Sequence, residues 1–243
     1  MRRAELHAVV LLLAGGTLLK LALTGGYLRY VKAGLRPLLL AAAVVLLAVA
    51  VLSLVQAVRH RAGDHASGHG DDGHGHAHGR LDVAWLLVLP MLALLLIAPP
   101  ALGSYSAARS GTALGAARTD LPPLPDGDPV RVSLLDYASR AVFDHGASLA
   151  GRHVLLSGFL LPGAHGGWYL TRMVITCCAA DAQPIKVGLA GEVPAGVKSG
   201  QWLEVTGAYS PRTEPDAVNA ETIPFVSVSA SRPIPAPQEQ YVS

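Results

Sequence analysis

Two groups of side chains in this 243-residue chain have the types and the spacing to bind a metal ion. The first lies within the Gly- and Asp-rich stretch 59–80 and consists of His60, His65, His69, His74, His76 and His78. Neutral imidazole is a ligand for zinc, nickel and copper, and Asp carboxylates add oxygen ligands. The glycines leave this backbone too free to hold a preformed site, so the stretch predicts the gathering of ions at a loop. The alternative is a solvated spacer that binds no metal.

The second group is the adjacent pair Cys177 and Cys178, with Asp181 three residues later. Neighbouring side chains in a strand point to opposite faces, so the two thiols converge on one ion only where the chain turns. Two thiolates and one carboxylate leave a tetrahedral zinc site one ligand short, which suits transfer of an ion better than a structural role. The fourth ligand would come from water, from a partner or from one of three histidines: His145, His153 and His165.

The same pair has three interpretations without a metal. A vicinal disulfide is strained, because neighbouring Cα atoms lie closer than disulfides prefer. A thiol redox pair would need a lowered pKa and lacks the Cys-x-x-Cys motif at a helix N-terminus that usually provides it; the nearby cation Arg172 is expected to lower the thiol pKa in the metal site. The third interpretation is structural, with a buried cysteine and a turn capped by the Asp181 carboxylate.

Three apolar segments, residues 8–28, 37–58 and 83–102, each approach the length that spans a bilayer. The chain is 51% hydrophobic and 15% charged, which is too apolar for an ordinary soluble domain. The first segment has the alternative of a cleaved signal peptide, although no good cleavage site follows it. Lys and Arg flank the segments equally on both sides, so the positive-inside rule gives no orientation. A net charge of +2 offers no broad basic surface for nucleic acid.

The composition changes after residue 102, which divides the chain into a membrane region (1–102), a Pro/Ala/Gly linker (103–129), a β domain (130–232) and a Pro-rich tail (233–243). One helix, residues 133–144, is predicted to have Ser133 as its N-cap and to stop at Gly146. Five strands are predicted at 152–161, 168–176, 185–189, 202–209 and 223–229. Five short strands with one helix favour a small OB-like β-barrel, in which Gly158 and Gly207 allow tight bends.

The segment Arg172 to Pro184 reads R-x-x-I-T-C-C-x-A-D-A-x-P, with Thr176 and Ala180 among its motif residues. It resembles the signature of a bacterial family of predicted two-component permease subunits. Further similar segments are G-x-x-V-x-x-S-G-F-L at 151–160, G-x-W-L-E-V-T-G at 200–207, P-x-P-x-x-x-Y at 235–241 and the stretch 27–38. The resemblance covers most of the chain and implies N-terminal spans, a stretch rich in His and Asp, and a separate multi-span permease as partner.

These observations predict a multi-pass protein of the bacterial plasma membrane that is not an enzyme, because no catalytic triad order or phosphate loop stands out. Three spans without a run of polar residues cannot form a conduction path alone, which agrees with an accessory permease subunit. Ligand chemistry indicates zinc or another divalent transition metal. The apolar segments imply the lipid bilayer as a partner, and the resemblance implies the separate permease. We expect the β domain outside the cytoplasm and the His-rich loop inside. The alternatives are a membrane-anchored protein that recruits a partner without metal, and a thiol redox protein.

Overall fold

The computed structural model describes residues 3–64, 89–90, 92–93, 96–97, 100–114 and 121–242. Its chain divides into two compact units, and the division does not follow the sequence order. The first unit holds residues 1–27 and 33–100, and the second holds residues 101–243 together with the short segment Leu28–Lys32. The connection between the first two helices is therefore a structural part of the C-terminal domain.

The first unit contains two long apolar helices, α1 (Arg3–Thr24) and α2 (Arg36–Asp64), joined through two short 3₁₀ helices at Gly26–Arg29 and Ala33–Leu35. Within them, residues 7–24 and 33–59 are long and apolar enough to cross a membrane. The third predicted segment lies mostly outside the described residues; residues 89, 90, 92, 93 and 96 of it are helical, and the Ile97 amide donates to the Ala93 carbonyl at 2.7 Å.

In this unit the small side chains are buried and the large apolar ones are exposed, which is the opposite of a soluble core. The fully buried residues are small, namely Ala8, Ala22, Ala43 and Ala50, each at most 1% exposed. A side chain on Gly15 would meet Leu47 at 2.9 Å, so glycine allows the two helices to approach closely. Large apolar side chains such as Leu38 and Leu52 are more than 60% exposed. Small residues between helices with large apolar residues outside are typical of helices packed in lipid.

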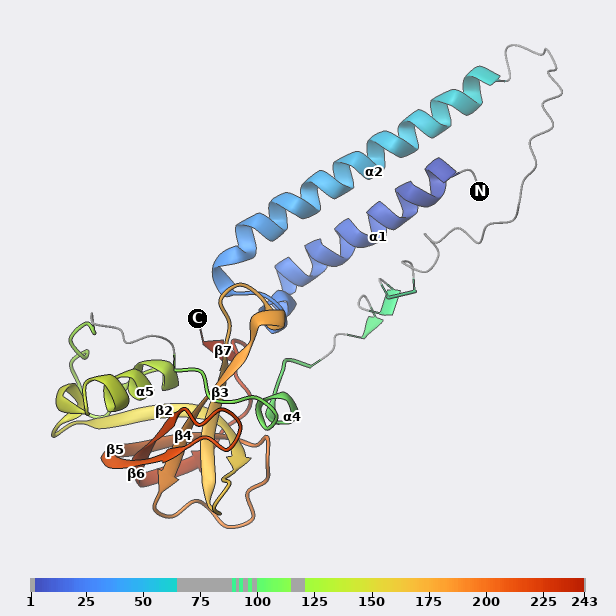
Figure 1. The fold of residues 1–243 in the computed structure, drawn as a ribbon. Helices are drawn as coiled ribbons and strands as arrows, with labels where there is room; N and C mark the ends of the chain where they lie inside the picture. The colour runs from blue at the N-terminus through green and yellow to red at the C-terminus, as the bar shows by residue number, and fades with distance from the viewer. Residues whose placement is uncertain are drawn as a thin grey trace. The chain divides into compact units, whose positions relative to one another are not determined.

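The C-terminal domain is a closed β-barrel (Figure 1). Its five strands are β2 (His153–Pro162), β3 (Trp168–Val174), β4 (Gln183–Ala190), β5 (Trp202–Pro215) and β6 (Thr222–Pro233). They pair in the order β2-β5-β6-β4-β3, and β3 returns to pair with β2, which closes the barrel. All neighbours are antiparallel except β4 and β6. The short strands β1 (Val130–Arg131) and β7 (Tyr241–Val242) add to β2 and β3 at the edges.

The predicted helix is present as α5 (Leu134–Phe143), with short helical turns at α4 (Ser104–Ala107), η3 (Ala147–Leu149) and η4 (Ala179–Asp181) elsewhere in the domain. The Ser133 hydroxyl accepts the Asp136 N–H at 3.0 Å, which confirms the predicted N-cap. Buried Leu134 and Tyr137 of α5 join the barrel core, where the Tyr137 hydroxyl donates to a β6 carbonyl at 2.6 Å. Gly146 then ends this region with a positive φ of 74°.

Two glycines in the barrel, at the positions predicted for tight bends, let neighbouring backbones approach closely. A Cβ on Gly158 would lie 2.6 Å from the Thr171 carbonyl oxygen of β3. A Cβ on Gly207 would lie 2.4 Å from the Ser227 carbonyl oxygen, at a break in the pairing of β5 with β6. Only glycine permits this approach of neighbouring backbones.

Candidate metal-binding turn

The Cys-Cys-Asp group lies in a tight turn between β3 and β4, and a carboxylate organises that turn. One carboxylate oxygen of Asp181 accepts the Thr176 N–H at 2.9 Å. The other accepts the Cys177 N–H at 2.8 Å and the Cys178 N–H at 3.5 Å. These bonds replace the strand ladder, because β3 has already ended at Val174. The chain thus leaves strand geometry at the point where convergence of the two thiols requires it.

The turn brings the three predicted ligands together. One ligand atom from each of Cys177, Cys178 and Asp181 lies within 4.8 Å of the others. Cys177 is exposed, Cys178 and Asp181 are partly exposed, and both cysteines are free thiols. Among the described residues this is the sole such cluster, and no histidine belongs to it. The geometry therefore fits three ligands to one ion and leaves further coordination positions to water or a partner.

Hydrogen bonding at the turn keeps the free thiol protonated. The bond to the Asp181 carboxylate and the contact with Cys178 raise the pKa of the Cys177 thiol to about 11. The same bond, with the backbone N–H groups of the turn, lowers the pKa of Asp181. This result is opposite to the lowered thiol pKa that a redox pair would need, and a metal ion would have to displace a proton to bind.

The predicted cation, Arg172, is engaged elsewhere. Its guanidinium donates to the Glu239 and Gln240 carbonyls of the C-terminal tail and lies over the Trp202 ring, 5.3 Å from the centroid. Trp202 is itself 8% exposed, so this aromatic packs in the domain and does not offer a stacking surface. Arg172 therefore holds the tail against the barrel.

Part of the family-similar stretch 27–38, for which the sequence predicted no role at the cysteines, braces the turn from outside the barrel. The Lys32 N–H donates to the Cys177 carbonyl at 3.1 Å, and the Ala179 N–H donates to the Tyr30 carbonyl at 2.7 Å. Between these bonds, Val31 and Cys178 form an antiparallel bridge. The two cysteines are thus framed on one side by Asp181 and on the other by main chain from the connection between α1 and α2.

The other predicted site residues lie apart from the turn or outside the description. The His65–His78 part of the His-rich stretch is outside the described residues, and the backbone of His60 belongs to the last turns of α2. Ala180 lies within η4, and the Pro184 carbonyl accepts the Ala113 N–H at 2.9 Å. His153 faces Asp128 at 3.1 Å, so its ring is engaged away from the cysteines.

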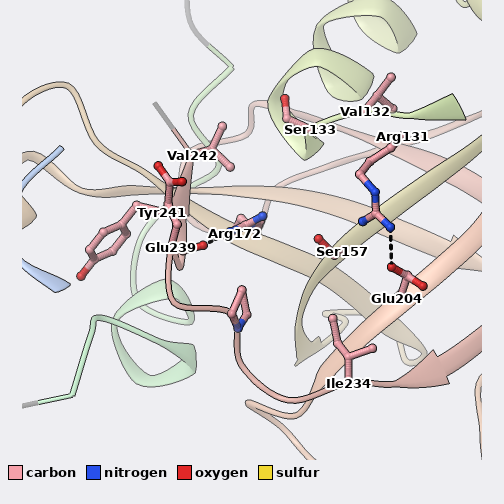
Figure 2. A pocket seen from close by; sticks show the side chains of 11 residues that line it. Arg131, Val132, Ser133, Ser157, Arg172, Glu204, Ile234, Glu239, Tyr241 and Val242 are labelled. Atoms are coloured by element: carbon pink, nitrogen blue, oxygen red, sulfur yellow. Dashed lines mark hydrogen bonds and ion pairs between the residues drawn. The ribbon is translucent and has the colours of Figure 1, made fainter. Parts of the chain in front are cut away.

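A cavity of about 500 Å³ lies beside β1, β2, β5 and the C-terminal tail (Figure 2). Arg131, Arg172 and Glu204 provide charged groups in its lining. Glu204 already pairs with Arg131 at 3.0 Å and with Arg232 at 2.5 Å. Since Arg172 is committed to the tail, these charges hold the domain together, and the cavity has no reactive group comparable to the cysteine pair.

A second buried polar cluster was not predicted from the sequence. Lys186 of β4 lies 2.7 Å from the Asp216 carboxylate, and both side chains are almost fully buried. The Lys186 ammonium also donates to the Ser110 carbonyl, and Asp216 accepts the Thr112 N–H at 2.9 Å. Alternation within a strand predicts which face a lysine occupies, but gives no signal for a partner thirty residues away.

Two family models match the chain: the DUF1980 N-terminal domain over residues 6–113 and the DUF1980 C-terminal domain over residues 138–243. Both describe domains of unknown function. No curated protein and no solved structure matches the chain.

Proposed function

We propose, from the premise that this chain belongs to the DUF1980 family, that it is an accessory subunit of a membrane permease complex that binds a transition-metal ion such as zinc. The observation that carries the proposal is the convergence of Cys177, Cys178 and Asp181 within 4.8 Å on an accessible turn. The permease partner comes from the resemblance of the segment Arg172–Pro184 to predicted two-component permease subunits.

The ligand set favours a soft or borderline ion that is passed on. Two thiolates and a carboxylate suit zinc and exclude calcium or magnesium as the preferred ion, because those ions take oxygen ligands. Structural zinc sites are closed by four protein ligands, whereas this turn supplies three. The exposure of Cys177 lets an ion arrive and leave without unfolding of the domain.

In this proposal the N-terminal unit is a multi-pass anchor in the bacterial plasma membrane, with a third span near residues 83–102. Small residues between α1 and α2, with large apolar residues outside, support lipid around both helices and retention of α1 instead of its removal as a signal peptide. The three spans lack a run of polar residues, so the path for an ion belongs to the partner. The β domain would be extracytoplasmic, and the His-rich stretch 59–80 would gather metal on the other face.

The barrel in this proposal is of the OB-like type, which five closed strands support. It serves as a rigid platform for the turn and not as a nucleic-acid binder. Of its main aromatic rings, Tyr169 and Trp202 are buried and Trp168 is partly exposed, which supports this role because single-strand binders need exposed rings.

The thiol redox alternative is weaker on the geometry of the turn. Both cysteines are free thiols, and the raised pKa of Cys177 opposes a nucleophilic thiolate. A measurement of metal binding distinguishes the proposal from the alternative of a membrane anchor without metal function, because only the proposal requires a bound ion.

The test is the zinc affinity of the full chain in detergent, measured by competition with a chromophoric chelator. Cys177→Ser/Cys178→Ser should lose more than the roughly 10–100-fold that removal of an outer-shell partner costs. The matched control is Asp144→Asn, because Asp144 also caps a turn through a backbone N–H, that of Ser148 at 2.8 Å. Asp144→Asn should leave affinity unchanged, whereas Asp181→Asn should lower it.

Deletion of residues 64–78 separates the two predicted metal-binding regions. We expect the deletion to reduce the number of bound ions while the thiolate-to-cobalt absorption of a cobalt-substituted sample stays. An intact protein that binds no zinc tighter than micromolar, or a double serine variant that binds like the parent, would refute the metal function.

A further inference from the structure

The connection between α1 and α2 has a structural role that its sequence does not announce. Residues Leu28–Lys32 belong to the same compact unit as the β-barrel, although the helices on both sides of them do not. This five-residue segment leaves one candidate span, joins the domain at the cysteine turn, and enters the next candidate span.

Tyr241 connects the end of the third apolar segment to the connection between α1 and α2. Its side chain is 4% exposed, and its hydroxyl donates to the Arg29 carbonyl at 3.0 Å. The same hydroxyl accepts the N–H of Leu102, the last residue of the third apolar segment, at 2.9 Å. Since Tyr241 also pairs with Met173 of β3, one buried phenol joins the α1–α2 connection, the start of the C-terminal domain and the barrel.

We infer that the cysteine turn is the membrane-facing end of the β domain, held at the bilayer surface on the face opposite to the His-rich stretch. The inference rests on the proposed function only in taking α1 and α2 as spans. If both cross, Leu28–Lys32 lies on one face and the end of α2 at Asp64 on the other. Because residues 101–243 share a unit with Leu28–Lys32, the chain must cross back between residues 64 and 101.

Described residues of the returning segment fit such a crossing. Leu89, Leu92 and Leu96 are helical and between 43% and 75% exposed. Large exposed apolar side chains on a helix are stable against lipid and costly against water. The shared unit requires an even number of crossings between residues 32 and 101, and a crossing by α1 makes the total odd, whichever way the protein is oriented.

Chain length limits how far the metal-binding turn can lie from the membrane. The Lys32 amide lies 3.1 Å from the Cys177 carbonyl oxygen, and α2 begins at Arg36. Four extended residues reach at most about 14 Å. An ion on the cysteines is therefore held next to the headgroups.

The first experiment maps the faces with a membrane-impermeant maleimide on intact and permeabilised bacterial cells. Single cysteines are placed at Gly34, Ser67 and Ser199 in the Cys177→Ser/Cys178→Ser background. Gly34 has open space for a side chain and Ser199 is exposed on the β domain. We expect Gly34→Cys and Ser199→Cys to label from the same face and Ser67→Cys from the other. Labelling of Gly34→Cys and Ser199→Cys from opposite faces, or of all three from one, would overturn the inference.

The second experiment tests the contact at the turn without reference to the membrane. Residues paired in an antiparallel bridge have Cα atoms about 4.5–5.5 Å apart, within the range of a disulfide. Val31→Cys in a Cys177→Ser background should therefore form a disulfide with Cys178. A protease site inserted between residues 115 and 120 shows the link, because the two fragments stay joined until reduction.

The matched control carries Val31→Cys and Ser199→Cys in the background without native cysteines, and it should release separate fragments. Failure of Val31→Cys to link with Cys178 would remove the brace and with it the inference. Zinc affinity is measured independently, so loss of metal binding would refute the proposed function while leaving this placement intact.

Discussion

Asp181 and Asp216 both order their surroundings through backbone N–H groups, yet they lie in opposite environments. Asp216 is 4% exposed and receives the Lys186 ammonium at 2.7 Å. Asp181 is partly exposed beside two thiols, and among the described residues it takes part in no ion pair. The first carboxylate is closed by a permanent cation, and the second leaves oxygen and sulfur atoms available to a ligand.

The contrast separates a structural cluster from a binding one. The Lys186–Asp216 pair fixes the chain near Ser110 and Thr112 to β4, which holds the segment leading into the domain against the barrel. A buried charge must be paired to be tolerated, so this cluster has no capacity left for an ion. In the Asp181 turn one carboxylate accepts the backbone N–H groups, and neither cysteine is in a disulfide.

The largest effect is expected when the buried pair is broken on its basic side. Lys186→Met leaves the Asp216 carboxylate buried without a cation, which should lower the free energy of unfolding by about 3–5 kcal/mol. Urea unfolding of the detergent-solubilised chain, followed by tryptophan fluorescence, measures the loss. Lys198→Met at an exposed position is the matched control and should change stability by no more than about 0.5 kcal/mol.

A double variant shows whether the cost comes from the unpaired charge. Lys186→Met/Asp216→Asn removes both charges and keeps an oxygen for the Thr112 N–H, so part of the lost stability should return. If Lys186→Met lowered the free energy of unfolding no more than Lys198→Met, the Lys186–Asp216 pair would not be a structural cluster, and the contrast with the Asp181 turn would be wrong.

A smaller effect, in chemical reactivity, is expected at the exposed cluster. A Cys177 pKa raised from 9.0 to about 11 makes the thiolate about 100-fold scarcer, partly offset by its greater nucleophilicity. We therefore expect Cys177 to react with iodoacetamide at pH 8 about tenfold more slowly than an exposed reference thiol, with a rate that still rises above pH 10. Mass spectrometry of the alkylated peptide against time gives the rate.

The reference thiol is Ser199→Cys in the background without native cysteines. Asp181→Asn should speed the reaction of Cys177, because the carboxylate is the first cause of the raised pKa. A Cys177 that reacts faster than the reference would favour the redox alternative over metal binding.

Apolar, β-branched runs between clear turn formers predicted the barrel well, although strict alternation is absent, because β4 and parts of β2, β3 and β5 are buried on both faces. The five predicted strands each overlap one observed strand. The helix begins after its predicted N-cap Ser133 and stops before Gly146. The predicted strands are shorter than the longest observed ones. β5 extends to Pro215 and β6 to Pro233, past the apolar run, because polar residues beyond the core still pair with each other.

The candidate site was predictable in its ligands and not in its supports. Adjacent cysteines followed by an aspartate are visible as a pattern, and carboxylate capping of turns is a local rule. Tyr30 and Lys32 brace the turn from about 150 residues away through main-chain atoms, which carry no sequence signal. Arg172 was expected to act on the thiols, but a guanidinium reaches several residues and here finds the tail carbonyls.

The smallest expected effect distinguishes the two carboxylates by pH. Burial acts to raise the pKa of Asp216, and the Lys186 ammonium with backbone N–H groups lowers it by more, so the folded pKa lies below the unfolded value near 3.9. A lowered folded pKa contributes stability above the unfolded pKa, and that stability is lost as pH falls through the folded value. A folded pKa that is lower by one than the unfolded pKa corresponds to about 1.4 kcal/mol of unfolding free energy.

Unfolding free energies measured between pH 6 and pH 2 should therefore fall less steeply in Asp216→Asn than in the parent chain. Asp126→Asn, at an exposed position, should keep the parent slope. Asp181→Asn should also reduce the loss of stability at low pH, since the pKa of Asp181 is lowered too. Added zinc should make the parent chain more stable than Asp181→Asn, but should make no such difference between the parent chain and Asp216→Asn. A zinc-dependent acid limb in Asp181→Asn and Asp216→Asn alike would place the ion elsewhere and erase the distinction between the two clusters.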